Sequence, residues 1–295
     1  MKTQPKISTI EVVVNVASGS VQPDAPQKMS ALLSELGFSA KVHAPAGAEL
    51  AKQLQDSVAA APDLLVILAG DGTARTAAEL AGPDGPLIAP LPGGTMNMLP
   101  HAVYGVTPWE EALTSILKDG FEKPIGGGEI DGHSFLVAAI LGSPALWAPA
   151  REAVREGKVK VAVHKARLAW RRAFSGRLRY ALDAGPRGKA EALAFLCPLA
   201  SKALDDDEQA LEAAVIDPRS VMDAARIGMN ALVNDWRNDP SVETARCRTA
   251  GVWAAGRIPA VLDGEPTRIA STSKVIWRPK VARVLCPCPP EEHGV

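Results

Sequence analysis

One stretch decides the fold of this chain: Leu64-Leu65-Val66-Ile67-Leu68-Ala69-Gly70-Asp71-Gly72-Thr73. Its apolar run is too short for a buried helix and ends at a glycine, so it predicts a central strand of a parallel sheet. The residues that follow, 74–80, are good helix formers. A strand, a glycine-containing turn and a helix in this order are typical of the places where open α/β sheets bind phosphate.

Two further segments repeat this arrangement. A strand expected at 10–14 leads into Asn15-Val16-Ala17-Ser18-Gly19-Ser20, and a strand expected at 87–91 leads into Pro92-Gly93-Gly94-Thr95-Met96-Asn97. Both loops combine glycine with hydroxyl and amide side chains. Because parallel strands end at the same edge of a sheet, we expect all three loops to meet in one crevice.

The residue types of these loops suit an anionic ligand. Backbone N–H groups near Gly70, Gly72 and Gly94 can approach phosphate oxygens closely because glycine has no side chain. The N-terminus of the following helix adds about half a positive charge. Asp71 would repel a bare phosphate, so its presence indicates Mg²⁺ or a proton in transfer. The alternative is an ordinary tight turn in which Asp71 caps the helix after it.

The three loops resemble those of the diacylglycerol kinase catalytic domain family, which includes bacterial lipid kinases and sphingosine kinases and has an NAD kinase-like fold. Four family motifs match in order: Asn-Pro-x-Ser-Gly, Gly-Gly-Asp-Gly-Thr, Pro-x-Gly-Thr-x-Asn and a C-terminal Asp-Gly-Glu. The matching residues are Asn15, Ser18 and Gly19, then Gly70 to Thr73, then Pro92, Gly94, Thr95 and Asn97, then Asp263 to Glu265. The chain departs from the family at Val16 (for proline), Ala69 (for the first glycine) and Met98 (for a frequent aspartate).

The resemblance implies ATP and Mg²⁺ as cofactors. It implies nucleotide contacts from Asn15, Ser18, Gly19, Gly70, Gly72, Thr73, Gly94, Thr95 and Asn97. It places Asp71 beside the metal and γ-phosphate, Asp263 as the general base and Glu265 as its support. The residues 262–266 alone leave a second interpretation open, because Leu-Asp-Gly-Glu-Pro is also good hairpin-turn chemistry.

An acidic cluster at 204–212 is similar to a family stretch in which some members bind a structural Mg²⁺. Hard oxygen ligands suit Mg²⁺, and Asp206 is the candidate ligand here. Asp207 and Glu208 stand where the family has glycine, with about two extra residues before Leu211. A solvated acidic turn is the alternative.

Strand and helix patterns alternate up to about residue 123, which predicts an α/β domain over 1–124 with a doubly wound parallel sheet. Beyond it, short strand patterns follow one another, which predicts a mainly antiparallel β-sandwich over 125–278. The resemblance implies that 125–278 is the lipid-substrate domain and that 279–295 return to the first domain.

Composition narrows the class of protein. The 295 residues carry a net charge of −1, which argues against nucleic acid as a partner. Four scattered cysteines do not form a disulfide framework, which fits a reducing cytoplasm. No apolar window is long enough for a transmembrane helix, so a lipid substrate would be met at the membrane surface.

Ten basic and two acidic residues lie between Arg151 and Tyr180, with Trp147, Trp170 and Phe174 beside them. This mixture suits peripheral contact with an anionic membrane. A phosphate contact by one arginine and a solvated helix face are the alternatives. The oligomeric state stays open, a homodimer included.

These observations together predict an ATP-dependent lipid kinase that transfers the γ-phosphate to a hydroxyl of diacylglycerol or a related lipid. NAD kinase is the first alternative, because it shares the Gly-Asp-Gly loop and the architecture. A nucleotide- or lipid-binding protein without catalysis is the second, because of the departures at Val16, Ala69 and Met98.

Overall fold

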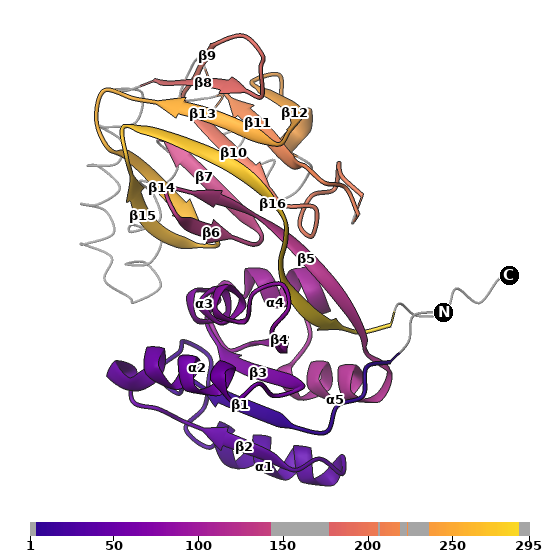
Figure 1. Ribbon diagram of the computed structural model, residues 1–295. Coiled ribbons are helices and arrows are strands. Elements are labelled where there is room, and N and C mark those ends of the chain that lie inside the picture. Colours follow the sequence, from indigo (N-terminus) through magenta and orange to yellow (C-terminus); the bar gives the residue numbers. More distant parts are fainter. Residues whose placement is uncertain (1–3, 143–176, 206, 219–222, 224–235, 289–295) are drawn as a thin grey trace, which may run out of the picture. The chain divides into compact units, whose positions relative to one another are not determined.

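The computed structural model describes residues 4–142, 177–205, 207–218, 223 and 236–288. The chain divides into two compact units (Figure 1). Unit 1 comprises Met1–Gly126 and Lys280–Val295, and unit 2 comprises Gly127–Pro279. Two strands, β5 (Phe121–Ile130) and β16 (Thr272–Cys286), run from one unit into the other.

Unit 1 is built on a parallel sheet in the order β2-β1-β3-β4-β16. Its strands are β1 (Ile10–Val14), β2 (Ala40–His43), β3 (Leu64–Ala69), β4 (Leu87–Pro92) and the end of β16. Every residue of β1 and β3 is buried, so both faces of these strands are covered. That burial on two faces is the reason for the unbroken apolar sequence of β3. In β1 it tolerates one charged residue, Glu11, which pairs with Lys41 and His43 of β2.

Helices cover both faces of this sheet (Figure 1). They are α1 (Ala25–Glu35), the short 3₁₀ helix η1 (Gly47–Glu49), α2 (Leu50–Ala59), α3 (Asp71–Ala81), α4 (Met98–Tyr104) and α5 (Trp109–Asp119). The even-numbered residues of β1 and β3 share one core cluster with Met29 and Leu33 of α1 and Leu113 of α5. The doubly wound arrangement predicted for this part of the chain is therefore confirmed.

Unit 2 contains a six-stranded antiparallel sheet in the order β12-β11-β10-β7-β14-β15. Its strands are β7 (Ala138–Gly142), β10 (Ala192–Leu196), β11 (Leu211–Ile216), β12 (Val242–Cys247), β14 (Ile258–Leu262) and β15 (Glu265–Ile269). A 3₁₀ turn, η3 (Trp236–Asn238), precedes β12.

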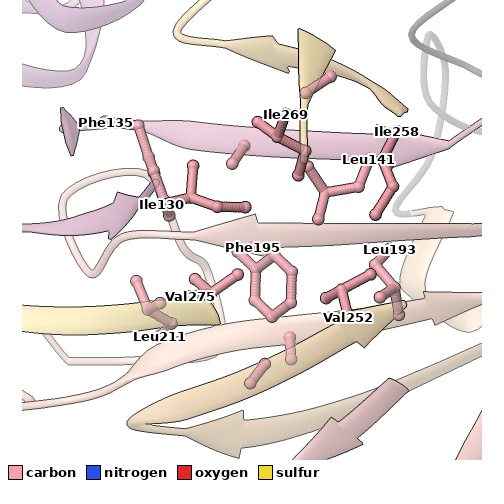
Figure 2. Packing of buried hydrophobic residues seen from close by; sticks show 14 of the residues in the cluster. Ile130, Phe135, Leu141, Leu193, Phe195, Leu211, Val252, Ile258, Ile269 and Val275 are labelled. Carbon is pink, nitrogen blue, oxygen red and sulfur yellow. The ribbon is translucent and has the colours of Figure 1, made fainter. Parts of the chain in front are cut away.

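A second antiparallel layer packs against this sheet. It consists of β16, β13 (Thr249–Trp253), β8 (Leu178–Leu182) and β9 (Gly188–Ala190), with β5 paired to β6 (His133–Phe135). Side chains from both layers, among them Phe195 of β10 and Val252 of β13, form one buried cluster (Figure 2). The predicted antiparallel sandwich is confirmed.

The stretch 134–140 forms parts of two strands and not one continuous strand. The structure has β6 up to Phe135 and β7 from Ala138, and Leu136 and Val137 lie between them. The amides of these two residues donate to a side-chain carboxylate and not to a neighbouring strand. The sequence of residues 134–140 alone does not reveal such an acceptor, so the interruption could not be predicted from its hydrophobic pattern.

Candidate functional site

Three loops follow the carboxyl ends of β1, β3 and β4, and backbone hydrogen bonds join them. The Asn15 amide donates to the Leu68 carbonyl at 3.0 Å. The Gly93 amide donates to the Ala69 carbonyl, and the Ser20 amide to the Gly93 carbonyl, each at 3.2 Å. The loops therefore do meet at one edge of the sheet.

The loops approach so closely that side chains would not fit between them. A Cβ on Gly94 would lie 2.7 Å from the Gly70 Cα, and a Cβ on Gly70 would lie 3.3 Å from the Ser18 Oγ. A Cβ on Gly19 would lie 2.7 Å from the Thr95 Oγ1. Position 94 therefore requires glycine, because the backbone of Gly70 lies too close for a Cβ. This close packing brings several of the predicted nucleotide contacts together.

Helix α3 begins at Asp71, directly after the extended residue Gly70. The Thr73 and Ala74 amides both donate to the Gly70 carbonyl at 3.1 Å. The amides of Asp71 and Gly72 come earlier in the first turn, where the helix offers no carbonyl partner. Two N–H groups at the positive end of an 11-residue helix therefore lie beside the converging glycines.

The Asp71 side chain is buried, with 6% of its surface exposed. Within the part of the chain that the structure describes, no side-chain hydrogen bond caps α3 at its N-cap residue, Gly70. The Asp71 Oδ1 instead accepts the Leu99 amide at 3.0 Å, so the carboxylate caps the first turn of α4. The alternative in which Asp71 caps its own helix does not describe this turn.

The two asparagines expected to contact nucleotide shape their own loops. The Asn15 Oδ1 accepts the Ala17 amide at 3.1 Å, and the Asn97 Oδ1 accepts the Gly94 amide at 2.7 Å. Asn97 has a left-handed backbone (φ 49°), which asparagine tolerates better than most residues. Both amide side chains thus hold loop geometry, and their NH₂ groups are the donors that a ligand would meet.

Asp263 and Glu265 lie in unit 2, at the turn between β14 and β15. Asp263 has a left-handed backbone (φ 46°) and is 2% exposed. Its Oδ2 accepts the Leu136 amide at 2.8 Å, and its Oδ1 accepts the Val137 and Ala138 amides at 2.9 and 3.0 Å. The Glu265 side chain is exposed.

The charge of Asp263 acts on a neighbouring thiol. Burial raises the pKa of Cys197 well above its ordinary value, and the Asp263 carboxylate raises that pKa further. The thiol also contacts the Phe135 carbonyl at 3.6 Å. Cys197 is therefore a protonated core residue and not a nucleophile.

A family model describes residues 9–128, the segment that carries all three loops, as a diacylglycerol kinase catalytic domain. This segment therefore matches the diacylglycerol kinase catalytic domain family. No curated protein is significantly similar in sequence to the chain.

Solved structures share the fold of nearly the whole chain. One, titled a diacylglycerol kinase from Bacillus anthracis Sterne, is 15% identical with a TM-score of 0.69, and the match covers 96% of this chain and 98% of that one. Two more from the same organism, provisionally titled diacylglycerol kinases, are 18% and 16% identical, each with a TM-score of 0.72 and the same coverage. The likeness shows that both units are arranged along the sequence as in those proteins.

Sequence reasoning assigned no role to two parts of the loop cluster, the Ser20 hydroxyl and the Leu99 amide. The Ser20 Oγ donates to the Gly94 carbonyl at 3.0 Å. Gly93 packs so tightly that a Cβ there would lie 2.7 Å from the Ala69 nitrogen. Leu99 supplies the amide that Asp71 accepts. The tight packing of Gly93 fits its place in the predicted loop, whereas nothing in the local sequence marks Ser20 or Leu99.

Two apolar side chains of the three loops are partly exposed. Val16 is 40% exposed and Met96 is 38% exposed. Thr95 and Val16 both lie among exposed loop residues, one after β4 and one after β1. The loops therefore offer apolar surface and hydroxyl groups next to their close-packed glycines.

The remaining predicted sites lie only partly within the residues that the structure describes. Asp206 lies outside the described residues, as do Arg151, Arg155 and most of the basic segment. Within the described part of that segment, Arg177 pairs with Asp217. The described residues contain no group of three or more His, Cys, Asp or Glu side chains placed to hold a metal, and none of their helices could span a membrane.

Proposed function

We propose that this chain is an ATP-dependent lipid kinase that transfers the γ-phosphate of ATP to a hydroxyl of diacylglycerol or a related lipid. The observation that carries the proposal is the convergence of three loops of a diacylglycerol kinase catalytic domain on the first turn of α3. Phosphoryl transfer depends on positioning and charge neutralisation more than on covalent chemistry, and this loop cluster suits both.

The residues present fit a triphosphate. The Asp71 and Gly72 amides at the start of α3 are donors for phosphate oxygens. Gly94 lets the backbone come close, and the hydroxyls of Ser18 and Thr95 lie beside it. The exposed apolar side chains of Val16 and Met96 suit the uncharged parts of a nucleotide.

The residues also fit Mg²⁺ held jointly with the nucleotide. Mg²⁺ in kinases is bound by one or two carboxylates, by waters and by the phosphates themselves. Asp71 is the carboxylate at the loop cluster, and only one of its oxygens is used by Leu99. Bound Mg²⁺ would neutralise phosphate charge during transfer.

The acceptor hydroxyl must lose its proton as it attacks, so a carboxylate has to lie near it. Asp71, Asp263 and Glu265 are the candidates that the family motifs contribute. The lipid would be met at a membrane surface, from the cytoplasmic side.

Incubation of the purified chain with γ-labelled ATP, Mg²⁺ and separate acceptors tests the proposal. A labelled product from diacylglycerol, a sphingoid base, ceramide or total bacterial lipid extract supports lipid kinase activity. Labelled NADP from NAD would favour NAD kinase, because that enzyme shares the loop around Gly70. ATP binding by calorimetry without any labelled product would identify a catalytically inactive binding protein.

A further inference from the structure

The surroundings of Asp263 do not suit a proton acceptor. Its two carboxylate oxygens accept three backbone amides, from Leu136, Val137 and Ala138, and its side chain is almost fully buried. A hydroxyl group of a substrate would have to displace at least one of these bonds to reach it.

Protonation of this carboxylate would also be costly. Hydrogen bonds from N–H groups favour the ionised form. A proton on Oδ2 would face the Leu136 amide, and a proton on Oδ1 would face the Val137 and Ala138 amides. Either way a donor would face a donor, and at least one buried amide would lose its partner. A group that does not readily accept a proton is a poor general base.

Unit 2 uses a second aspartate in the same way. Asp183 follows β8, has a left-handed backbone (φ 48°), and donates its amide to the Thr249 carbonyl at 2.8 Å while its Oδ1 accepts the Thr249 amide at 2.8 Å. Asp263 donates its amide to the Ala138 carbonyl at 2.9 Å, and its Oδ1 accepts the Ala138 amide at 3.0 Å. The two aspartates therefore make the same reciprocal pair of bonds.

A third aspartate shares the turn geometry. Asp131 lies between β5 and β6 with a left-handed backbone (φ 49°) and, like Asp263, precedes a glycine with positive φ. Its Oδ2 accepts the Ala270 amide at 2.9 Å and the Ser273 hydroxyl at 2.8 Å. An aspartate that fastens its turn to another segment is thus a recurrent building element of unit 2.

We propose that Asp263 is a positioning residue, whose carboxylate clamps the β14–β15 turn to the segment 136–138, and that it does not take the proton of the acceptor hydroxyl. The statement about the acceptor proton rests on the proposed lipid kinase function, whereas the clamp does not. The clamp fixes the start of β15, where the exposed Glu265 is the carboxylate of this turn that solvent reaches.

The test uses the full chain with Asp263→Asn and Asp263→Ala, and Asp183→Asn as the matched control. Asparagine keeps one acceptor oxygen and alanine keeps none, so amide hydrogen exchange at 136–138 should accelerate in Asp263→Asn and more in Asp263→Ala. The Tm should fall in the same order, by about 2–4 °C or more for each change. The rate of phosphoryl transfer should fall less in Asp263→Asn than in Asp263→Ala. In both variants the pH–rate profile should still fall at acid pH as in the wild type, because the general base is another residue.

Asp183→Asn should accelerate exchange only at Arg248 and Thr249 and leave turnover unchanged. Wild-type exchange and Tm in Asp263→Asn would overturn the inference. An equal loss of turnover of about 10²–10⁴-fold in both Asp263 variants, with the acid limb gone, would also overturn it. A wild-type chain that phosphorylates no lipid would refute the kinase function instead, and exchange and melting would still decide whether Asp263 is a clamp.

Discussion

The Asp71 Oδ1 accepts the backbone amide of Leu99, 28 residues further along the chain, at 3.0 Å. This bond joins the first turns of α3 and α4 next to the glycine-rich loops. Among the residues that the structure describes, no protein group donates to the other oxygen, Oδ2. One carboxylate can therefore fix the scaffold with one oxygen and serve a cation with the other.

Because the two oxygens of Asp71 have different roles, two substitutions of this residue should differ in their effect on stability. Asp71→Asn keeps an oxygen for Leu99, so the Tm should stay near that of the wild type, while transfer should fall by about 10²-fold or more with the charge removed. Asp71→Ala also loses the cap, which should lower the free energy of unfolding by about 0.5–2 kcal/mol. Thermal unfolding and labelled-ATP assays on both variants measure this, and full turnover in Asp71→Asn would remove Asp71 from the site.

Gly94→Ala should separate the loops. The added Cβ would meet the Gly70 backbone at 2.7 Å, and a backbone atom cannot rotate away as a side chain can. We expect a loss of about 1–3 kcal/mol in the free energy of unfolding and weaker ATP binding. Gly47→Ala is the matched control, because no atom lies within 4 Å of its new Cβ. Equal ATP affinity in the two variants, measured by calorimetry, would contradict the expected role of close loop packing.

Asp63→Asn should change how the stability of the chain depends on pH. The Ser8 and Thr9 amides hold the pKa of the Asp63 carboxyl below its ordinary value of 3.8. A lowered native pKa stabilises the fold above the ordinary value, and this stabilisation is lost as the pH falls through the native value. Urea unfolding should therefore show the wild type more stable than Asp63→Asn at about pH 7, with a smaller difference near pH 2. A difference independent of pH would show that Asp63 does not contribute through its charge.

The cysteines should react with iodoacetamide in a set order. Burial, followed by the nearby Asp183, raises the pKa of Cys247 to about 12, and Cys197 and Cys286 are buried as well, whereas Cys288 is exposed. Because the thiolate is the reacting form, native protein at about pH 8 should be alkylated at Cys288, and at the other three only after unfolding. Peptide mass spectrometry reads the sites, and early modification of Cys247 would indicate local opening of β12.

The strands of unit 1 could be predicted because they are buried on both faces. The mainly apolar stretch 10–14 and the apolar run 64–69 match β1 and β3, and the glycine-bearing loops after them lie where the parallel-sheet rule expects. Helix α4 was not predicted, because the proline at position 100 and its seven-residue length hide a helical pattern.

The errors in unit 2 have a different origin. The stretch 124–128 lies inside β5, although its one proline and three glycines are poor strand formers. Gly128 is needed there since a Cβ would lie 1.9 Å from the Phe135 ring. The break at Leu136 and Val137 is imposed by Asp263, more than a hundred residues away. Partners that distant cannot be read from a local sequence pattern.

The strand β16 also has a consequence for the order in which the chain is made. Val284 pairs with Ile88 of β4, and Leu285 is fully buried in the core that α1 and α5 cover. On the ribosome, residues up to Gly126 emerge before β16, so the edge of β4 is unpaired at that stage. Well over a hundred further residues must be synthesised before β16 can pair with this edge. Unit 1, although most of it is translated first, is completed last, and nascent chains would need shielding of that edge for most of their synthesis.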